Sequence, residues 1–200
     1  MHLDRRQALR KLAAGGLGAA SAPLWSRRLA ELAIAHADPH APTAGAAAGA
    51  EPWKPKLLDA HQNDTVVALS ELIIPQTDTP GAKAAGVNQF IDLVLSEAAP
   101  AERREFLRGL GWMDARSQEL FGSDFVSAAP DQQAALLTIL SAPGNRSAAD
   151  RLGRDFFESI KGLTVTGYYT TEIGLRQELG EDGGLFLAAY PGCQHPQHKV

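Results

Sequence analysis

From residue 57 onward, hydrophobic residues recur at the three- and four-residue spacing that places them on one face of an α-helix. In residues 88–98, for example, Phe90, Ile91 and Val94 share such a face. The pattern predicts helices over residues 59–74, 88–98, 100–121, 130–140, 147–168 and 169–179.

Prolines and glycines at the ends of these segments support the predicted boundaries. Pro75 ends the first helix because it cannot donate the backbone hydrogen bond that a helix interior needs. Pro100 and Pro130 suit the first turn of a helix, where that hydrogen bond is not required. Pro143 closes the fourth helix, and Gly180 suits the C-cap of the last one.

The stretch LTVTGYY at residues 163–169 is ambiguous. Its β-branched and aromatic residues suit a strand, but no partner strand is evident in the sequence. We therefore expect the helix to continue or to bend at Gly167. Residues 57–200 are predicted to form one all-α domain, an irregular bundle of about six helices that ends in an irregular tail.

The first 37 residues have the composition of an export signal. The adjacent pair Arg5 and Arg6 lies in a basic start, before a weakly apolar stretch rich in Ala and Gly. This arrangement resembles the twin-arginine signal, although Asp4 and Ala8 stand where that signal often has Ser or Thr and Phe. The alternative is a short amphipathic helix with an arginine-rich face.

Removal of such a signal needs small residues before the cleaved bond. The run AIAHA offers two such sites, which end at Ala35 and Ala37. Whether or not the signal is removed, we expect residues 1–37 to take no part in the fold. Residues 38–56 follow as a linker, since twelve of these nineteen positions are Ala, Gly or Pro and bury too little apolar surface to offset the cost of ordering.

Charge is distributed unevenly between these segments. Residues 1–37 hold six of the 19 Arg and Lys residues but only two of the 23 acidic ones. The rest of the chain is therefore acidic and would repel phosphate backbones, which argues against nucleic acid as a partner. No run of about 18 apolar residues indicates an ordinary transmembrane helix.

The sequence lacks the motifs of the common enzyme classes. It contains no G-x-G-x-x-G motif and no P-loop, no C-x-x-C-H haem motif and no G-x-S-x-G elbow. We therefore expect neither a catalytic residue nor a resident cofactor or metal in this chain. Asp78 and Thr79 could act as ligands, but capping of a turn explains them better.

The C-terminal run YPGCQHPQHKV holds the only cysteine, Cys193, followed by His195 and His198. These side chains could bind zinc or copper, with His61 or Asp182 as a speculative fourth ligand. A Cys–His nucleophile needs a base held in a cleft, which a Pro/Gly-rich tail does not offer. An idle tail is another hypothesis. In an exported protein, however, a lone cysteine suggests a disulfide with another chain, and we favour this interpretation.

Three separated blocks of the sequence carry a family resemblance. They are ELIIPQTDTPGAKAAGVNQFIDLVL, GYYTTEIGLRQELG and YPGCQHPQH, which occur in that order between about residue 60 and residue 198. Together with the twin-arginine-like start, they are similar to the gluconate 2-dehydrogenase subunit 3 family, whose members are also called gamma or small subunits.

This resemblance implies a non-catalytic helical subunit that binds a large FAD-dependent partner of the glucose–methanol–choline type. That partner would oxidise a sugar or sugar acid, and the complex often passes the electrons to a cytochrome c subunit with haem c. The small subunit would carry the signal for the twin-arginine translocase and help the flavin subunit to reach the periplasm and mature. Membrane association would come through the complex or an uncleaved signal.

The resemblance also supports Cys193 as the residue of an inter-subunit disulfide. Candidates for the partner interface are Tyr168, Tyr169, Tyr190, Pro191, His195 and His198. For the first two tyrosines, packing in the core is an equally good explanation. The rival to the whole interpretation is a stand-alone periplasmic metal-binding protein or enzyme that uses the Cys-x-His-x-x-His tail.

Overall fold

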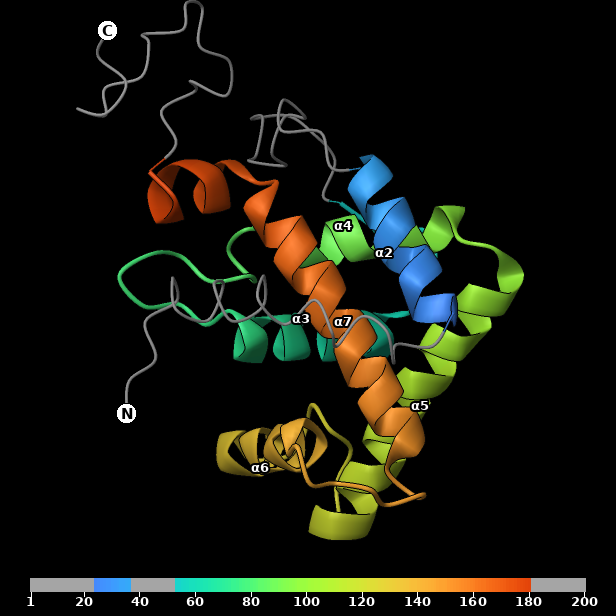
Figure 1. The fold of residues 1–200 in the computed structure, drawn as a ribbon. Coiled ribbons are helices and arrows are strands. Elements are labelled where there is room, and N and C mark those ends of the chain that lie inside the picture. The colour runs from blue at the N-terminus through green and yellow to red at the C-terminus, as the bar shows by residue number, and fades with distance from the viewer. Residues whose placement is uncertain (1–23, 37–52, 181–200) are drawn as a thin grey trace, which may run out of the picture.

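The computed structural model describes residues 24–36 and 53–180, and within these ranges every regular element is helical (Figure 1). The predicted all-α class is therefore confirmed. The elements are α2 (Leu24–His36), α3 (Ala60–Ile73), α4 (Val87–Glu97), α5 (Pro100–Phe121), α6 (Pro130–Ser141), α7 (Arg151–Tyr169) and the π-helix η2 (Ile173–Glu178).

The ends of the helices follow from local chemistry. Asp59 caps α3, because its carboxylate accepts the backbone N–H of Gln62 at 2.8 Å while the Gln62 side chain accepts the N–H of Asp59 at 3.1 Å. Pro100 and Pro130 occupy the first turns of α5 and α6, as predicted. Gly122 ends α5 with a φ of 80°, a left-handed conformation that glycine adopts without steric cost.

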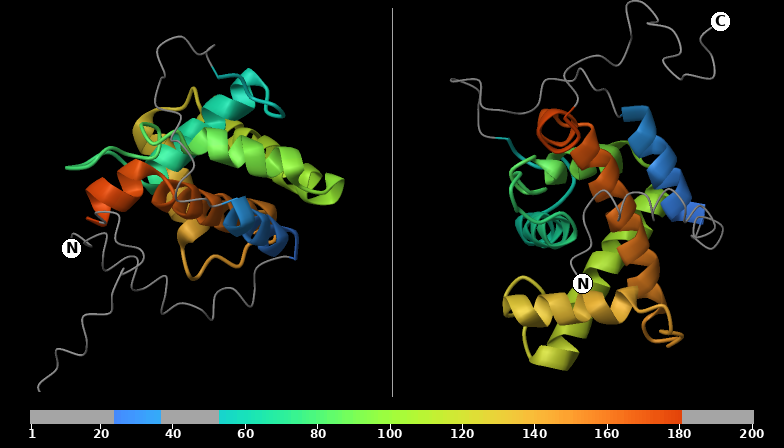
Figure 2. Two further views of the ribbon diagram at one scale, coloured as in Figure 1. Left: turned by 90° about the horizontal axis from the view of Figure 1, so that it is seen from above. Right: turned by 60° about the vertical axis from the view of Figure 1, so that its left-hand side comes forward.

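Helix α7 is the centre of the bundle. It packs against α2, α3, α4, α5 and α6, and η2 follows its last turn at the end away from α6 (Figures 1 and 2). Its buried apolar side chains are Phe156, Phe157, Ile160, Leu163 and Tyr168. Burial of one such side chain stabilises a fold by about 1.5–3 kcal/mol, so this stripe is a large part of the core.

Two glycines bring α5 and α7 close together. A Cβ on Gly109 of α5 would lie 2.3 Å from the Phe156 ring, and a Cβ on Gly153 of α7 would lie 2.1 Å from the Trp112 ring. Phe106 also meets Phe156 edge to face, with ring centroids 5.1 Å apart. Each glycine therefore makes room for an aromatic ring of the opposite helix.

The N-terminal part of the fold differs from expectation. We expect residues 1–37 to take no part in the fold, but residues 24–36 form α2, which packs on α7. Leu29 is 1% exposed and Ala33 is 0% exposed, whereas Leu24 is 76% exposed. This segregation is that of an amphipathic helix, the alternative given above for the N-terminal segment, and Arg28 and Glu31 are exposed on its outer face.

A buried carboxylate ties the start of the helical domain to α4. Asp92 of α4 is only 1% exposed. Its carboxylate accepts the backbone N–H groups of Lys56, Leu57 and Leu58 at 2.7, 3.1 and 3.0 Å. These bonds satisfy the carboxylate away from water and fix the chain at the end of the predicted linker, just before α3 begins.

Helix α7 begins later than predicted, at Arg151 instead of Ser147. The residues before it form a loop that side chains hold in place. Asn145 donates to the Ile139 carbonyl at 3.0 Å, and Arg154 donates to the Ser147 carbonyl at 2.9 Å. These hydrogen bonds from side chains to nearby backbone carbonyls compete with the helix and delay its start.

The other end of α7 settles the ambiguous segment. The helix continues through Gly167 to Tyr169, so LTVTGYY is helical. A Cβ on Gly167 would lie 2.7 Å from the Phe90 ring, which shows that glycine here serves close packing against α4. The helix predicted over 169–179 is wrong in type and extent, because the chain turns after Tyr169 and forms the shorter π-helix η2.

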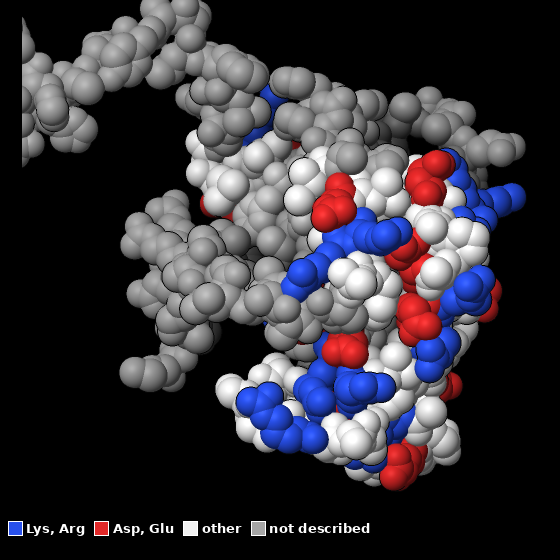
Figure 3. Space-filling view, turned by 45° about the vertical axis from the view of Figure 1, so that its right-hand side comes forward, with Lys and Arg blue, Asp and Glu red and all other residues white. Residues whose placement is uncertain are grey.

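Basic and acidic side chains are interspersed on the surface of the described residues (Figure 3). On α5 and α7, Arg108 pairs with Glu105 at 2.8 Å and Lys161 pairs with Glu158 at 2.7 Å. Exposed pairs of this kind contribute about 0.3–0.5 kcal/mol each. Of the helices described, none has both the length and the hydropathy needed to cross a membrane.

Candidate functional site

Two of the three sequence blocks that carry the family resemblance meet at one end of the bundle. The first block forms the end of α3, the loop of residues 74–86 and most of α4. The second forms the last turn of α7 and η2. Residues 74–86, here named the α3–α4 loop, lie beside the end of α7 and η2 in Figures 1 and 2.

The carboxylate of Glu71 binds the first and the second half of the α3–α4 loop. Glu71 of α3 accepts the backbone N–H of Gln76 at 2.8 Å with one oxygen and that of Lys83 at 2.9 Å with the other. Gly81 leaves room for this carboxylate, since a Cβ there would lie 2.4 Å from Glu71 Oε1. The loop is therefore tied to the helix that precedes it.

The end of α7 and η2 hold the tip of the same loop. Tyr168 is fully buried, and its hydroxyl donates to the Pro80 carbonyl at 2.7 Å. The neighbouring Thr79 donates its hydroxyl to the carboxylate of Glu178 in η2. Two elements that are distant in sequence thus fix the position of the tip.

The π-helix η2 has a specific packing reason. The Leu179 N–H donates to the Gly174 carbonyl at 3.1 Å, with the five-residue spacing of a π-helix. A Cβ on Gly174 would lie 2.2 Å from the Tyr168 carbonyl oxygen, so only glycine fits against the end of α7. The Thr171 hydroxyl joins the two helices, because it donates to the Tyr168 carbonyl at 2.7 Å and accepts from the Gly174 N–H at 3.1 Å. Such helices occur frequently at functional sites.

This end of the bundle exposes apolar groups. Leu179 is 44% exposed. Tyr169 is partly exposed and packs edge to face on Tyr168, with ring centroids 5.1 Å apart. Pro75 and Gln76 are exposed on the α3–α4 loop. We name the exposed surface of the loop, Tyr169 and Leu179 the α7-end face.

The structure reaches only some of the predicted site residues. The following lie outside the described residues: Arg5, Arg6, Tyr190, Pro191, Cys193, His195 and His198. Tyr168 is fully buried, so core packing, the alternative to an interface role, describes its side chain. Tyr169 stays an interface candidate. Asp78 accepts a hydrogen bond from the Thr77 hydroxyl at 2.7 Å, a contact within the turn.

Among the described residues, no group of three or more His, Cys, Asp or Glu side chains is placed to hold a metal ion. His61, the speculative fourth ligand of the tail, bonds through Nε2 to Asp114 Oδ2 at 2.8 Å, while Asp182 lies outside the described residues. The hydrogen bond to Asp114 raises the pKa of His61. Burial opposes the rise, and the negative charges of Asp114, Asp124 and Asp59 add to it. His61 thus links α3 to α5.

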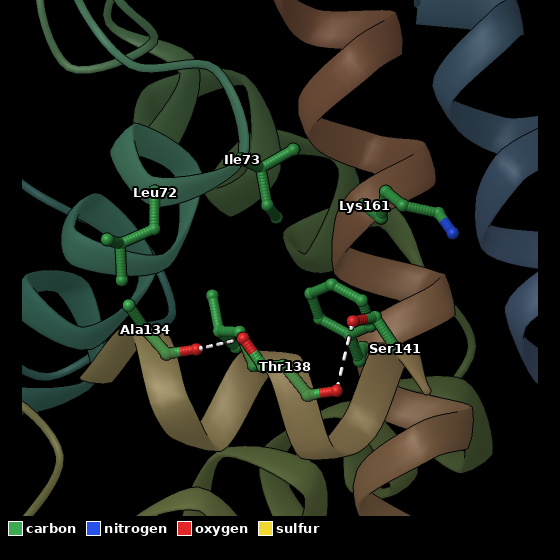
Figure 4. A pocket seen from close by; sticks show the side chains of 8 residues that line it. Leu72, Ile73, Ala134, Thr138, Ser141 and Lys161 are labelled. Carbon is green, nitrogen blue, oxygen red and sulfur yellow. Dashed lines mark hydrogen bonds between the residues drawn. The ribbon is translucent and has the colours of Figure 1, made fainter. Parts of the chain in front are cut away.

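A shallow pocket of about 350 Å³ opens between α3, α6 and α7 (Figure 4). Leu72 and Ile73 of α3 contribute to its largely apolar wall. The Thr138 hydroxyl donates to the Ala134 carbonyl at 2.8 Å, and the Ser141 hydroxyl donates to the Thr138 carbonyl at 3.2 Å. Both hydroxyls donate within α6, so only their acceptor lone pairs are left for a ligand in the pocket.

Sequence reasoning missed the groups that organise the α7-end face. No role was predicted for Glu71, yet its carboxylate accepts two backbone N–H groups of the loop. The available signal was an acidic residue one turn before Pro75, followed by a loop whose backbone N–H groups need acceptors. Nothing local in the sequence indicates that Tyr168 reaches Pro80.

A comparison with protein families matches residues 60–182 to gluconate 2-dehydrogenase subunit 3. Searches of curated proteins and of solved structures gave no match. The matched range covers more than half of the 200 residues and contains both blocks that meet at the α7-end face. The chain therefore belongs to the gluconate 2-dehydrogenase subunit 3 family, and it is an accessory subunit of a dehydrogenase complex.

Proposed function

We propose that this chain is the non-catalytic small subunit of a periplasmic FAD-dependent sugar or sugar-acid dehydrogenase. It aids the export, maturation and stability of the flavin subunit. Membership of the family supports an accessory role in a dehydrogenase complex. Catalysis and FAD then belong to a large partner of the glucose–methanol–choline type, and haem c belongs to a cytochrome c subunit where the complex has one.

One observation carries the proposal: the two family blocks converge on one end of the bundle and hold an exposed loop rigid there. Glu71 and Tyr168 bind the α3–α4 loop from two sides. Partly exposed Tyr169 and Leu179 lie at the same end. A rigid loop beside exposed apolar groups suits protein–protein contact, since little conformational freedom is lost on binding. We therefore propose the α7-end face as the surface that meets the flavin subunit.

The C-terminal tail extends this proposal. It follows Gly180, directly after η2, so its first residue is joined to the chain at the α7-end face. We propose that Cys193 in this tail forms a disulfide with the flavin subunit, which an oxidising compartment permits. Tyr190, His195 and His198 would then contact the partner beside that bond. A covalent tether keeps two weakly binding surfaces at a high effective concentration.

The export part of the proposal rests on the sequence. Arg5 and Arg6 would direct the chain to the twin-arginine translocase, which carries folded cargo together with a bound partner. The flavin subunit would travel with the small subunit into the periplasm. Membrane association would come through the complex or through an uncleaved signal.

The decisive experiment co-expresses the chain with the large flavin subunit of the same source, followed by affinity purification. We expect a yellow complex whose two chains separate on a denaturing gel only after reduction. In Cys193→Ser the chains should run separately with or without reductant. A yellow complex that separates without reductant keeps the accessory role and excludes the disulfide. A colourless chain that purifies by itself with bound metal would favour the rival metal-protein hypothesis.

Two exposed leucines provide a matched test of the surface. Leu179 at the α7-end face is 44% exposed, and Leu120 near the end of α5 is 40% exposed. Replacement by Asp should affect the fold to a similar, small extent at the two positions, because both side chains are exposed to a similar degree. We expect Leu179→Asp to reduce the yield of flavin complex at least about tenfold, which corresponds to about 1.4 kcal/mol of binding free energy, while Leu120→Asp leaves it unchanged. Equal yields would place the interface elsewhere.

A further inference from the structure

Helix α2 forms part of the core although it lies within the segment expected to act as an export signal. Leu29 and Ala33 are 1% and 0% exposed, and Ser26, also in α2, is 7% exposed. Trp25 and Leu32 are partly buried and pack against the same core. The buried positions recur at three- and four-residue intervals, so one whole face of α2 is committed to the bundle.

The surface beneath α2 depends on it. The helix packs on α7 and also meets α4 and α5. At the start of α5, the Glu102 side chain is 9% exposed, and Arg28 Nη1 lies 3.6 Å from its Oε1. Loss of α2 would therefore uncover apolar side chains of three helices and would remove the cation that faces a nearly buried carboxylate.

The two small-residue sites predicted for signal cleavage lie at the C-terminal end of α2, so that cleavage there would remove the helix. Ala35 is in the last turn of α2, and Ala37 follows the last residue, His36. Cleavage after Ala37 would separate the whole of α2 from the subunit, and cleavage after Ala35 would separate all of it except His36. Proteases act preferentially on exposed, extended segments. A chain that is exported by the twin-arginine route has already folded, so α2 would be packed on the bundle and protected from cleavage at its end.

We propose that α2 is a permanent part of the folded subunit, and that any processing of the export segment removes only residues that precede Leu24. The statement about processing rests on the proposed export, whereas the statement about α2 does not. The arginine pair Arg5 and Arg6 is thus joined to an element that packs only when the bundle has formed.

The proposal that processing spares α2 is tested on the full-length chain with a C-terminal tag, exported together with its flavin partner. Intact mass and N-terminal sequencing of the purified subunit give the first residue of the mature chain. We expect a mature chain that still contains Leu24–His36. A folded complex whose small subunit begins after Ala35 or Ala37 would overturn the proposal.

The proposal that α2 is part of the folded core is tested on the full-length chain kept in the cytoplasm, so this test does not depend on export. Leu29→Ala removes a buried side chain of α2, and Leu24→Ala removes one from the 76% exposed position on the same helix. We expect Leu29→Ala to lower Tm by about 5–10 °C and Leu24→Ala to change it by no more than about 1 °C. Equal small shifts would mean that α2 is dispensable, whatever the outcome of the export experiment.

Discussion

The two ends of α7 are held in different ways. Near its start, Gly153 faces Trp112 and Phe156 faces Gly109, so α7 and α5 meet through close apolar packing. At its last turn, Tyr168 donates a hydrogen bond to a loop carbonyl, and the Thr171 hydroxyl joins α7 to η2. Close packing of rings against glycines joins the first end to α5, whereas hydrogen bonds fix the α3–α4 loop and η2 at the second end.

This difference suggests that the first end of α7 mainly stabilises the fold, whereas the second end positions the α7-end face. Close packing resists any change in volume, and overpacking typically costs about 1–3 kcal/mol. A single hydrogen bond contributes about 0.5–1.5 kcal/mol, but it fixes the direction of the group that it binds. We therefore expect variants near the start of α7 to act mainly on the free energy of unfolding. Variants near its end should act more on binding of the flavin subunit.

The largest effect is expected at the α5–α7 contact. In Gly109→Ala the new Cβ would lie 2.3–2.6 Å from three Phe156 atoms, among them the Phe156 Cβ, which cannot move without its helix. We expect the free energy of unfolding to fall by about 2–3 kcal/mol, as measured by urea denaturation.

The same helix supplies the control for this change. A Cβ on Gly111 would meet nothing within 4 Å, and alanine is the better helix former by about 1 kcal/mol. Gly111→Ala should therefore stabilise the subunit. If both variants shift stability in the same direction, close packing does not define this end of α7.

Next in size is the loss of the buried hydroxyl at the other end. Tyr168→Phe leaves the ring in the core but removes the donor to the Pro80 carbonyl. We expect the free energy of unfolding to fall by about 1 kcal/mol, and the yield of flavin complex to fall further than this loss of stability explains. Pull-down at a temperature where the variant is fully folded separates the two effects. Unchanged complex formation would mean that the loop tip takes no part in docking.

The sequence predicts the helices better than it predicts the contacts between them. Helical periodicity and prolines located α3 to α6 closely, since these signals are local. The hydrogen bond between Tyr168 and Pro80, and the clamp of Asp92 on residues 56–58, join positions far apart in sequence. Periodicity does not encode such pairings, so the α7-end face could not be assembled from the sequence.

The packing of α2 and the π form of η2 differ from the favoured predictions for different physical reasons. In α2, a basic and Ala-rich composition suggested a signal, although Leu29 and Ala33 have the spacing of a buried helical face. In η2, the local pattern does predict a helix. Its π form follows from the contact of Gly174 with the Tyr168 carbonyl, a property of the folded chain.

A smaller effect on stability is expected at Glu71, which sharpens the distinction between folding and docking. Glu71→Gln keeps one carbonyl oxygen, while its NH₂ group would face the second backbone N–H of the α3–α4 loop. Because the loop is exposed, we expect a loss of less than about 1 kcal/mol in unfolding free energy but a clear fall in complex yield. Glu97→Gln, at an exposed position on α4, is the matched control. Equal complex yields for the two variants would exclude the loop from the interface.

The smallest effect concerns an exposed polar link, the contact of His61 in α3 with Asp114 in α5. Its hydrogen bond raises the pKa of His61 above the ordinary 6.5, so the folded chain holds this proton more tightly than the unfolded chain. The stabilisation is fully present below pH 6.5 and is lost as the pH rises through the raised pKa. The His61 side chain is 49% exposed, and solvent screening limits the effect to about 0.3 kcal/mol. Subtraction of the unfolding free energy of His61→Gln from that of the unmodified chain, at about pH 5.5 and about pH 8.5, isolates this term. The difference in unfolding free energy should shrink at the higher pH. A difference that grows would mean that Asp114 does not stabilise the protonated ring of His61. Buried hydrogen bonds such as that of Tyr168 to Pro80 would then be the polar contacts that stabilise the fold.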